Sequence, residues 1–266
     1  MTEEKIPVLE TKSLGIQFGG LKAVNDVNIK VYKGELVGLI GPNGAGKTTI
    51  FNLITGIYKP TSGSYLLCGK KMNGLKTHQV VREGIARTFQ NIRLFKKMTV
   101  LDNVRIAFNK NMKASLLQSV FRTPYFWKEE AETKEKAMEL LKLFKLESFA
   151  DQYAENLPYG KQRLLEIARA LATDMKLLLL DEPAAGMNPV ETAELKESIK
   201  MLRQKFGIPI LLIEHDMSLV MSICERIYVL NFGEVLTSGV PSEIAVNPDV
   251  IAAYLGEEEE GDDSDA

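Results

Sequence analysis

The stretch "LVGLIGPNGAGKTTIF", from Leu36 to Phe51, decides the fold. It opens with a short, continuously apolar run, which is typical of a strand buried on both faces of a sheet. A glycine-rich loop follows and leads into an apolar-striped helix. The loop fits the pattern G-x-x-x-x-G-K-[ST], in which glycines let the chain wrap so that successive N–H groups point at a phosphate. The stretch therefore predicts a phosphate-binding strand–loop–helix unit.

Individual residues of this loop have expected roles. Lys47 spans the β- and γ-phosphates of a nucleotide, and the hydroxyl of Thr48 ligates Mg²⁺. The alternative is a glycine turn with an incidental lysine, which requires neither the buried strand before the loop nor the helix after it. The residues expected to bind ATP are Gly41, Pro42, Asn43, Gly44, Ala45, Gly46, Lys47, Thr48 and Thr49.

A second apolar run, "KLLLLDEP", ends in the acids Asp181 and Glu182. An acid at the end of a buried strand is costly unless it holds a metal, directly or through water. We therefore expect Asp181 to hold Mg²⁺ and Glu182 to orient or deprotonate an attacking water. The alternative for Asp181 is a helix N-cap before "EPAAG", which the strand and the pairing with the loop disfavour.

Strands and helices alternate along the second half of the chain. The strands are expected in "KLLLLD", "GIPILLIEH" and "RIYVLNFGEVLTSG", with helices beginning near Pro189 and Asp216. This order predicts an α/β fold with a mostly parallel core sheet and helices on both of its faces.

Two further regions have a distinct pattern. Apolar and polar residues alternate in "AVNDVNIKVYKGE", which predicts one half-buried strand. Residues from about 98 to 149 are expected to be helical, with Met112, Leu116 and Val120 on one stripe. Within that region "RTPYFWKEE" is interpreted as a loop.

Composition places the chain among ordinary globular proteins, with 45% hydrophobic and 26% charged residues in a length of 266. Its apolar runs are far shorter than the ~20 residues of a membrane-spanning helix. The beginning, "MTEEKIPV", has acids where a signal peptide has basic residues, which favours the cytosol. Cys68 and Cys224 are interpreted as buried or half-buried thiols in a reducing compartment.

The net charge of −2 conceals an acidic end, "EEEEGDDSDA", in which seven of ten residues are acids. Residues 257–266 are therefore expected to be disordered, because they cannot bury enough apolar area to fold. Without them the charge becomes +5, since seven negative charges are removed from a total of −2. So small a positive charge, with no nucleic-acid-binding signature, predicts no nucleic-acid partner.

Five motifs together resemble those of ABC-type ATPases in order and spacing, and the resemblance covers nearly the whole chain. They are "GPNGAGKTT", "RTFQ", "LPYGKQRLLEIARAL", "LLLLDEP" and "LIEHD". The resemblance implies one ATPase domain over 1–256, with a RecA-like core, a small antiparallel β subdomain and an inserted helical subdomain at about 91–172. It also implies ATP and Mg²⁺ as cofactors.

The resemblance assigns roles to three further residues. Phe18 would stack on adenine, although an ordinary core phenylalanine is the alternative. Gln90 would join the metal and the attacking water to the helical subdomain, with a surface glutamine as the alternative. His215 would touch the γ-phosphate, whereas His78, the other histidine, is expected to face solvent.

In this family a Leu-Ser-Gly-Gly-Gln run binds the γ-phosphate of ATP held by the opposite subunit. Here Pro158 removes the serine hydroxyl and one N–H, while Gly160 keeps its N–H and permits close approach of the backbone. Asn188 stands in the dimer loop where many relatives carry aspartate. The run that fills the signature positions is Leu157, Pro158, Tyr159, Gly160 and Lys161.

Several kinds of P-loop protein are alternatives to a transporter subunit. A kinase should lack "RTFQ" and His215, and a regulatory nucleotide binder would typically lose Glu182. ABC proteins of translation carry two ATPase domains in one chain, and those of DNA repair have a long coiled-coil insertion. Transport is therefore the preferred interpretation.

The details resemble the longer of the two ATPase subunits of high-affinity branched-chain amino acid importers. This implies a second ATPase subunit (a homodimer is the alternative), two membrane permeases and an external binding protein, with the chain peripheral at the cytoplasmic face of the membrane. Importers of urea or of other amides and amino acids stay open. The resemblance rests on "FGGLKAVNDV", "IARTFQNIRLFKKMTVLDNV", "DEPAAGMNP" and "NPDVIAAYLG", with extra helical material at 109–127.

The segment "RLFKKMTVLDNV" is expected to dock a cytoplasmic helix of a permease. Its apolar anchors Leu94, Phe95 and Met98 lie beside Lys96 and Lys97. The alternative is a plain helix–loop of the protein core.

Overall fold

The computed structural model describes residues 6–111 and 124–261. The chain forms two compact units. The first unit comprises Met1–Arg87, Lys176–Ala184 and Ile199–Ala266, and the second comprises Thr88–Met175 and Ala185–Ser198.

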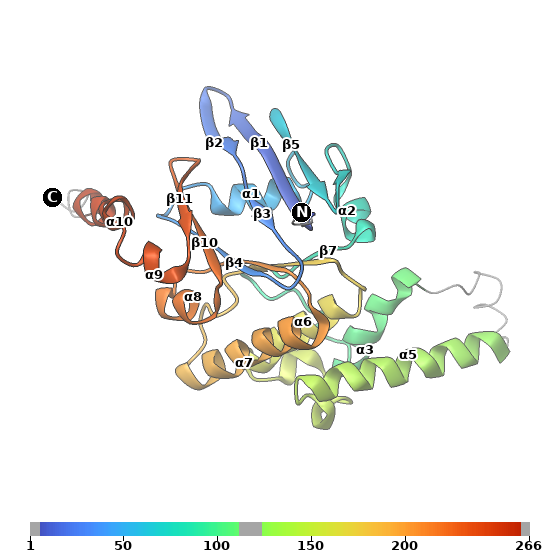
Figure 1. Cartoon of the computed structure of the whole chain (residues 1–266). Coiled ribbons are helices and arrows are strands. Elements are labelled where there is room, and N and C mark those ends of the chain that lie inside the picture. Colours follow the sequence, from blue (N-terminus) through green and yellow to red (C-terminus); the bar gives the residue numbers. More distant parts are fainter. Residues whose placement is uncertain (1–5, 112–123, 262–266) are drawn as a thin grey trace, which may run out of the picture. The chain divides into compact units, whose positions relative to one another are not determined.

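The first unit contains an antiparallel sheet of order β2-β1-β5-β6, with β3 paired to β1. Figure 1 shows β1, β2 and β5 side by side. The strand predicted over "AVNDVNIKVYKGE" is interrupted, because β2 ends at Val27 and β3 begins at Lys30, although both pair antiparallel with β1. Asp26, near the end of β2, has a φ of 49°, and the side-chain amide of Asn28 donates to its carbonyl (2.9 Å) at this interruption. The strands are β1 (Leu9–Phe18), β2 (Leu21–Val27), β3 (Lys30–Val31), β5 (Ser62–Leu67) and β6 (Lys70–Lys71).

The core sheet of the first unit has the order β11-β10-β4-β9-β8-β7. All neighbours are parallel except β10 and β11. Every residue of β4, β8 and β9 is buried, as their continuous apolar sequence predicts. The strands are β4 (Leu36–Ile40), β7 (Ile85–Arg87), β8 (Leu177–Asp181), β9 (Ile210–Ile213), β10 (Arg226–Asn231) and β11 (Glu234–Gly239).

One hydrophobic core joins the two sheets of the first unit. Ile50, Phe51 and Ile54 of α1 (Lys47–Ile54) belong to the same cluster as side chains of β1, β4 and β9. The other helices are α2 (Thr77–Glu83), α8 (Met217–Ile223), α9 (Pro241–Ile244) and α10 (Pro248–Gly261), while α7 (Pro189–Phe206) begins in the second unit and ends in the first.

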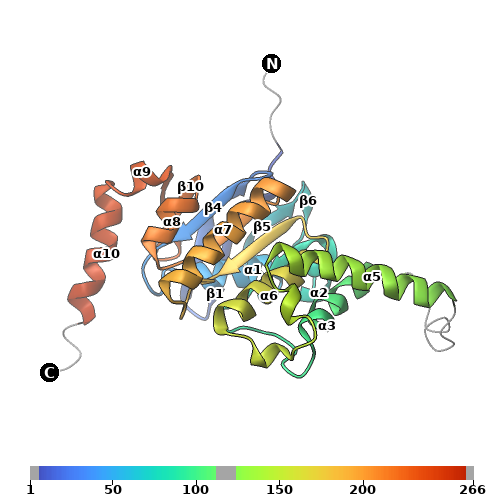
Figure 2. The same ribbon diagram turned by 90° about the horizontal axis from the view of Figure 1, so that it is seen from below.

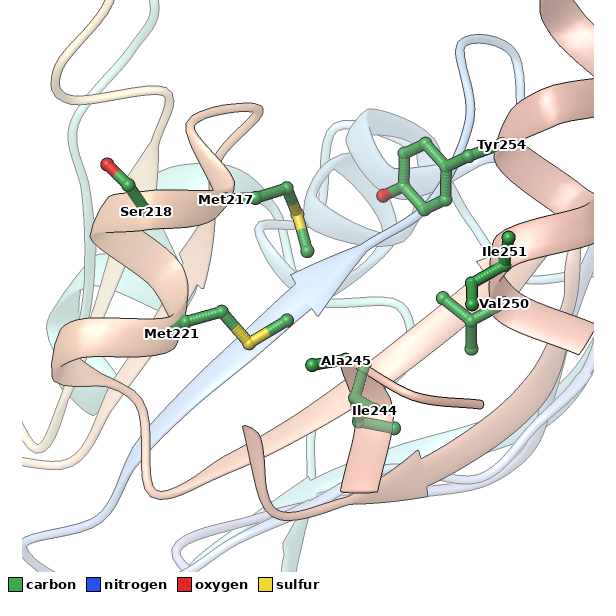
Figure 3. A pocket seen from close by; sticks show the side chains of 8 residues that line it. All are labelled: Met217, Ser218, Met221, Ile244, Ala245, Val250, Ile251 and Tyr254. Atoms are coloured by element: carbon green, nitrogen blue, oxygen red, sulfur yellow. The ribbon is translucent and has the colours of Figure 1, made fainter. Parts of the chain in front are cut away.

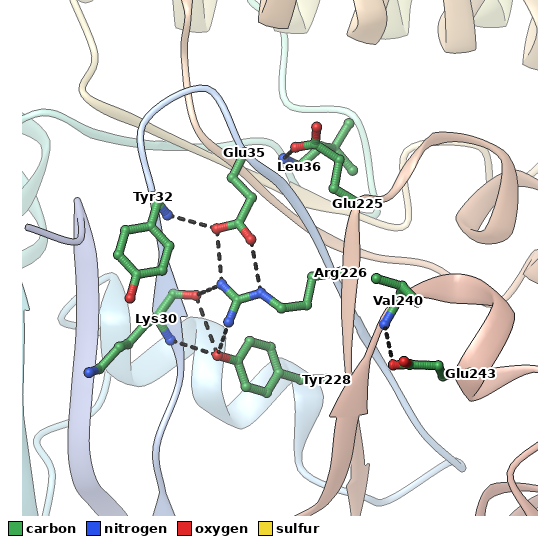
Figure 4. Close-up of polar contacts among 9 residues, drawn as sticks. All are labelled: Lys30, Tyr32, Glu35, Leu36, Glu225, Arg226, Tyr228, Val240 and Glu243. Carbon is green, nitrogen blue, oxygen red and sulfur yellow. Dashed lines mark hydrogen bonds and ion pairs between the residues drawn. The ribbon is translucent and has the colours of Figure 1, made fainter. Parts of the chain in front are cut away.

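A polar cluster also fixes the two sheets of the first unit to each other (Figure 4). The guanidinium of Arg226 on β10 donates to both carboxylate oxygens of Glu35, at 2.8 and 2.9 Å, and to the carbonyl of Lys30 on β3 at 2.7 Å. The backbone N–H of Lys30 in turn donates to the hydroxyl of Tyr228 (3.1 Å). Bidentate, charge-assisted bonds of this kind define geometry as well as adding energy.

Helix α10 extends beyond the point expected from the sequence. It includes residues 257–261 of the acidic stretch, and residues 262–266 lie outside the described part of the chain. Glutamate is a good helix former, so a run of four glutamates continues a helix that has already begun. Within residues 6–111 and 124–261, no helix combines the length and the apolar character that crossing a membrane requires.

The second unit is mostly helical, and Figure 2 shows its long helix α5 beside α3. The loop predicted for "RTPYFWKEE" is wrong, because α5 begins at Pro124 and runs through Trp127. Proline is favourable in a first helical turn, where its missing N–H has no partner to lose. Met112, Leu116 and Val120 lie outside the described residues. The helices are α3 (Val100–Arg105), η1 (Ile106–Asn111), α5 (Pro124–Leu143), η2 (Glu147–Phe149), η3 (Ala154–Asn156) and α6 (Tyr159–Leu171).

The two cysteines differ in exposure, which corrects the expectation for Cys68. Cys68 is exposed at the turn between β5 and β6, whereas Cys224 is buried. Burial raises the pKa of the Cys224 thiol to about 12. We therefore expect one thiol to react with a disulfide reagent at about pH 8 in the folded protein and two in denaturant. Cys68→Ser should leave no reactive thiol in the folded protein, and rapid reaction of both native thiols would contradict the buried position of Cys224.

Candidate active site

The predicted site residues of the first unit meet at one edge of the core sheet. Strands β4, β9, β8 and β7 are consecutive neighbours and run parallel, so their carboxyl ends lie at the same edge. Gly41 follows β4 directly, and His215 follows β9 after one intervening residue. Asp181 ends β8 and Arg87 ends β7. The fold thus brings together the glycine loop, the two acids and the histidine, which are far apart in the sequence.

The glycine loop is held tightly against β10. Gly41 has a φ of 148°, and a Cβ there would lie 2.1 Å from the carbonyl oxygen of Leu230, so only glycine fits. The N–H of Gly233 donates to the carbonyl of Ala45 (3.0 Å) from the turn after β10. These contacts fix the path of the loop.

The ammonium of Lys47 is enclosed by the loop. Lys47 is 6% exposed, and its Nζ donates to the carbonyls of Gly41 (2.5 Å) and Pro42 (2.7 Å). By contrast Asn43, Gly44 and Thr48 are exposed on the open side of the loop. A lysine and the first N–H groups of α1 at one place make a site for an anion such as phosphate.

Asp181 has an ion-pair partner that the sequence analysis missed. Its carboxylate, 4% exposed as a residue, accepts a bond from the Arg87 guanidinium at 2.6 Å. Arg87 also donates to the side chain of Asn52 (2.8 Å) and lies 5.4 Å from the ring centroid of Phe51. The available signal was an arginine at the end of the apolar run "IAR", within the motif that was interpreted only for Gln90.

The residues predicted to bind Mg²⁺ carry the type of donor atom that this ion prefers. The Thr48 hydroxyl and the Asp181 carboxylate are oxygen donors, and Mg²⁺ is usually bound by one or two carboxylates together with substrate phosphates. Among the described residues there is no group of three His, Cys, Asp or Glu side chains suited to a metal. Gln90, the third predicted ligand, is exposed and belongs to the second unit.

Glu182 and His215 face each other. The Nε2 atom of His215 lies 2.8 Å from Oε1 of Glu182. The N–H of Glu182 donates to the carbonyl of Ile213 (2.9 Å), and Glu182 has a φ of 46°, a conformation that costs energy for a residue other than glycine. The backbone is therefore strained at Glu182, and the carboxylate lies beside the histidine, which is an arrangement suited to positioning a water molecule.

Glu214 is a second residue that the sequence analysis missed. It is buried, and its carboxylate accepts N–H bonds from Ala184 (2.7 Å) and His215 (3.0 Å). Burial raises the pKa of this carboxyl, while the N–H bonds act in the opposite direction. Glu214 thus ties the chain after Glu182 to the chain around His215. The sequence signal that could have identified Glu214 is the presence of an acid directly between a buried strand and a histidine.

Phe18 is not a core side chain. It is 45% exposed and makes an edge-to-face contact with Tyr58, with ring centroids 5.2 Å apart. Its stacking on adenine stays a prediction. His78 is exposed, as expected.

In the second unit the signature run begins helix α6. Leu157 is buried, Pro158 is the N-cap residue, and Tyr159 and Lys161 lie on the first turn. The N–H of Gly160, which was expected to meet a phosphate, donates to a carboxylate oxygen of Glu191 (3.0 Å). A Cβ on Gly160 would lie 2.7 Å from the same oxygen, so a larger residue there would have to displace the Glu191 side chain.

Glu191 also binds the predicted dimer loop. Its second carboxylate oxygen accepts the N–H of Asn188 (3.1 Å), and the side chain of Asn188 accepts the N–H groups of Val190 and Glu191 (3.0 Å each). This reciprocal arrangement is a capping box at the start of α7. Glu191, which the sequence analysis did not single out, thereby joins the two elements predicted to contact the opposite subunit.

A separate apolar cavity of about 480 Å³ lies among α8, α9 and α10 (Figure 3). Met217 and Met221 of α8 face Ile244, Val250 and Tyr254 across it. None of the predicted site residues lines this cavity.

Comparison with known families gives two matches. Residues 24–185 match the model of the ABC transporter family. Residues 234–260 match the model described as "Branched-chain amino acid ATP-binding cassette transporter".

Individual proteins match over nearly the whole chain. The high-affinity branched-chain amino acid transport ATP-binding protein BraF of Pseudomonas aeruginosa is 50% identical over 94% of this chain and 98% of its own length. LivG of Escherichia coli, which has the same description, is 51% identical with the same coverage.

Solved structures match as well. The ADP conformation of MJ1267, an ATP-binding cassette of an ABC transporter, has a TM-score of 0.81 and 34% identity, over 94% of this chain and 99% of that one. The dimeric post-hydrolysis structure of the cassette MJ0796, bound to ADP and Pi, has a TM-score of 0.73 and 26% identity, over 88% of this chain and 98% of that one.

These matches confirm two predictions made from the sequence, namely the resemblance to ABC-type ATPases and the α/β fold with its parallel core sheet and antiparallel β subdomain. With a family model matching more than half of its residues, the chain belongs to the ABC transporter family, as one of its ATP-binding cassette ATPases.

Proposed function

We propose that this chain is the ATP-hydrolysing subunit of a membrane importer for branched-chain amino acids. The observation that carries the ATPase part is the sheet edge where the Lys47 loop, Asp181 and the Glu182–His215 pair meet. The cargo rests on the relatives named for branched-chain amino acid transport and on the family match at 234–260. Importers of urea or of other amino acids and amides are the second candidate, because an ATPase subunit does not touch its cargo.

The residues of the first unit divide the chemistry among them. Lys47 exchanges the carbonyls of its own loop for the β- and γ-phosphates, together with the loop N–H groups. Thr48 and Asp181 hold Mg²⁺, which when bound neutralises phosphate charge. Glu182 accepts a proton from the attacking water. His215 orients Glu182 through their contact, and His215 also touches the γ-phosphate.

We infer that two such subunits close head to tail around two ATP molecules, with Gln90 joining the metal and the water to the helical subdomain at about 91–172. The dimeric structure of the related MJ0796 cassette, bound to ADP and Pi, supports dimerisation. The partners are a second ATPase subunit or a second copy, two permeases and an external binding protein. The chain then works at the cytoplasmic face of the membrane.

Replacing Glu191 by Gln tests the role of the signature helix. The Gly160 N–H donates to the carboxylate of Glu191 in this structure. In the proposed dimer the γ-phosphate of the opposite subunit's ATP reaches the same N–H, so the carboxylate and the phosphate compete for it. Glutamine keeps the shape and one acceptor but removes the charge. We therefore expect ATP-dependent dimerisation to tighten by about two- to fivefold, measured by light scattering.

Glu194→Gln is the matched control, because Glu194 lies one helical turn further along α7 and pairs with Lys161 at 2.8 Å. Its effect on dimerisation should be smaller than that of Glu191→Gln. Equal effects of the two variants, or weaker dimerisation of Glu191→Gln, would contradict competition at Gly160.

Residues 94–98 are proposed as the docking surface for a permease. Phe95 is 48% exposed, and Lys97 makes an exposed ion pair with Glu155 (2.7 Å). Reversing the charge of Lys96 and Lys97 to Glu should slow association with the permeases by about tenfold, while ATP affinity holds. Lys142→Glu and Lys145→Glu provide a charge-matched control on the same unit. Unchanged assembly of the first variant would refute this docking surface.

The proposed function is tested with the complete transporter. Uptake of labelled leucine and of labelled urea is compared in a deletion strain, with and without the gene for this chain. Restored leucine uptake supports the proposal. If only urea uptake is restored, the transporter imports urea and not branched-chain amino acids. If the purified complex neither retains ATP nor releases phosphate, the proposal that this chain is an ATPase is wrong.

A further inference from the structure

The apolar cavity among α8, α9 and α10 takes no part in the proposed chemistry, and all the residues that line it belong to the first unit (Figure 3). Its volume is about 480 Å³. The hydroxyl of Ser218, which also lines it, donates to the carboxylate of Asp216 (2.6 Å). We call this cavity the α8–α10 groove. Its apolar lining includes Met217 and Met221 of α8, Ile244 of α9, and Val250, Ile251 and Tyr254 of α10.

The α8–α10 groove is open at the surface. Ile244 and Val250 are 2% and 5% exposed, so part of its lining belongs to the packed interior. Met217, Met221 and Tyr254 are only half-buried, and Ile251 is 46% exposed. Single exposed apolar side chains are ordinary, but several that line one depression mark an interaction site.

Two helices supply the facing walls of the groove. Met217 and Met221 are four residues apart on α8, and Val250 and Tyr254 are four apart on α10. Figure 3 shows the two rows on opposite sides of the groove. An amphipathic helix binds in such a groove through apolar residues at i, i+3, i+4 and i+7. The flexible methionine side chains adapt to the shape of a bound helix.

The chain that forms one side of the groove is strongly acidic. Residues 241–266 contain five glutamates and four aspartates but no lysine or arginine. Two of these glutamates, residues 257 and 258, lie three and four positions after Tyr254, one turn further along α10. On the other side the exposed Asp216 directly precedes Met217. A segment with lysine or arginine beside its apolar residues complements this arrangement.

The same charges disfavour two other occupants. A second copy of the chain, bound through the same surface on both copies, would bring two acidic segments together. Like charges opposite each other at an interface cost free energy. An anionic membrane surface is repelled for the same reason. Charge and shape together favour a basic helix of another protein.

We propose that the α8–α10 groove docks an amphipathic helix of a partner protein, with apolar residues at helical spacing and lysine or arginine along their edges. The inference goes beyond the proposed function and does not depend on it. It gives a binding role to the segment 234–260, which matches the branched-chain amino acid cassette model and supplies Ile244, Val250, Ile251 and Tyr254 to the groove.

The test uses the full chain and a fluorescent synthetic peptide of about 16 residues, long enough to form a helix in water. The peptide has leucines at i, i+3, i+4 and i+7 and lysines beside them. Fluorescence anisotropy should show saturable binding of one peptide per chain. A second peptide with glutamate in place of each lysine should bind at least about tenfold more weakly. Binding that does not saturate, or equal binding of the two peptides, overturns the proposal.

Two variants locate the bound peptide. Ile251→Gln and Met221→Gln each remove an apolar contact without changing charge, so each should weaken binding by about tenfold. Val246→Gln is the matched control, because Val246 is 74% exposed in the same acidic segment and does not line the groove. Its affinity for the peptide should equal that of the unchanged chain. ATP affinity should be the same in all three variants, which shows that they are folded.

Other results would name another occupant. If Ile251→Gln binds the lysine peptide as tightly as Val246→Gln does, the peptide lies elsewhere and the proposal is wrong. Self-association of the unchanged chain, measured by light scattering and abolished by Ile251→Gln, would assign the groove to a second copy. Binding to phosphatidylglycerol vesicles that Ile251→Gln abolishes would assign it to the membrane. Either result overturns the proposal, while the ATPase function stands.

Discussion

Glu182→Gln is expected to lower ATP turnover by about 10³-fold while ATP binding is retained. Glutamine has the shape of glutamate and keeps a hydrogen bond to His215, which lies 2.8 Å away in this structure. It cannot accept a proton from the attacking water as the carboxylate does. Binding therefore survives, and the chemical step does not.

The consequence is an ATP-bound dimer that does not dissociate. We expect it to appear in light scattering with partner subunits and excess ATP present, and phosphate release should be measured in the same samples. Glu225→Gln is the control, because Glu225 is also an ion-paired carboxylate of the first unit, at 2.7 Å from Arg203. A Glu182→Gln variant that stays monomeric under these conditions would exclude the dimer mechanism for this chain, and unchanged turnover would exclude Glu182 as the base.

The parts of the site that the sequence revealed are those whose chemistry is local. A phosphate-binding loop needs glycines at fixed offsets before a lysine, and only glycine fits at Gly41 because β10 lies so close. Buried parallel strands are continuous apolar runs, so "LVGLI" and "LLLLD" were recognisable as strands of a core sheet.

The parts that the sequence did not reveal are pairings between distant side chains. Arg87 and Asp181 are 94 residues apart, and Gly160 and Glu191 are 31 apart. Periodicity indicates which face of an element is buried, but not which charged groups meet once the elements pack. Local rules also failed where a residue has two uses, since the proline and aromatic residues of "RTPYFWKEE" suit a loop as well as the first turn of α5.

The buried pair of Arg87 and Asp181 gives the second large prediction. Asp181→Asn should abolish hydrolysis, because it removes the carboxylate assigned to Mg²⁺. It should also destabilise the fold by about 3 kcal/mol, since the side chains of this pair are only 5% and 6% exposed and the variant removes the carboxylate that faces a buried guanidinium. The free energy of unfolding is measured by urea denaturation without nucleotide.

The double variant Asp181→Asn with Arg87→Met separates the two effects. Removing the arginine together with the aspartate should restore most of the lost stability, because no charge is then left opposite a neutral partner. Hydrolysis should stay absent, since the metal ligand is still missing. If stability recovers in the double variant and activity does not, Asp181 has two separable roles, as a structural partner of Arg87 and as a metal ligand. If Asp181→Asn alone is as stable as the unchanged protein, the ion pair seen here contributes nothing to the fold, and the carboxylate is retained for the metal only.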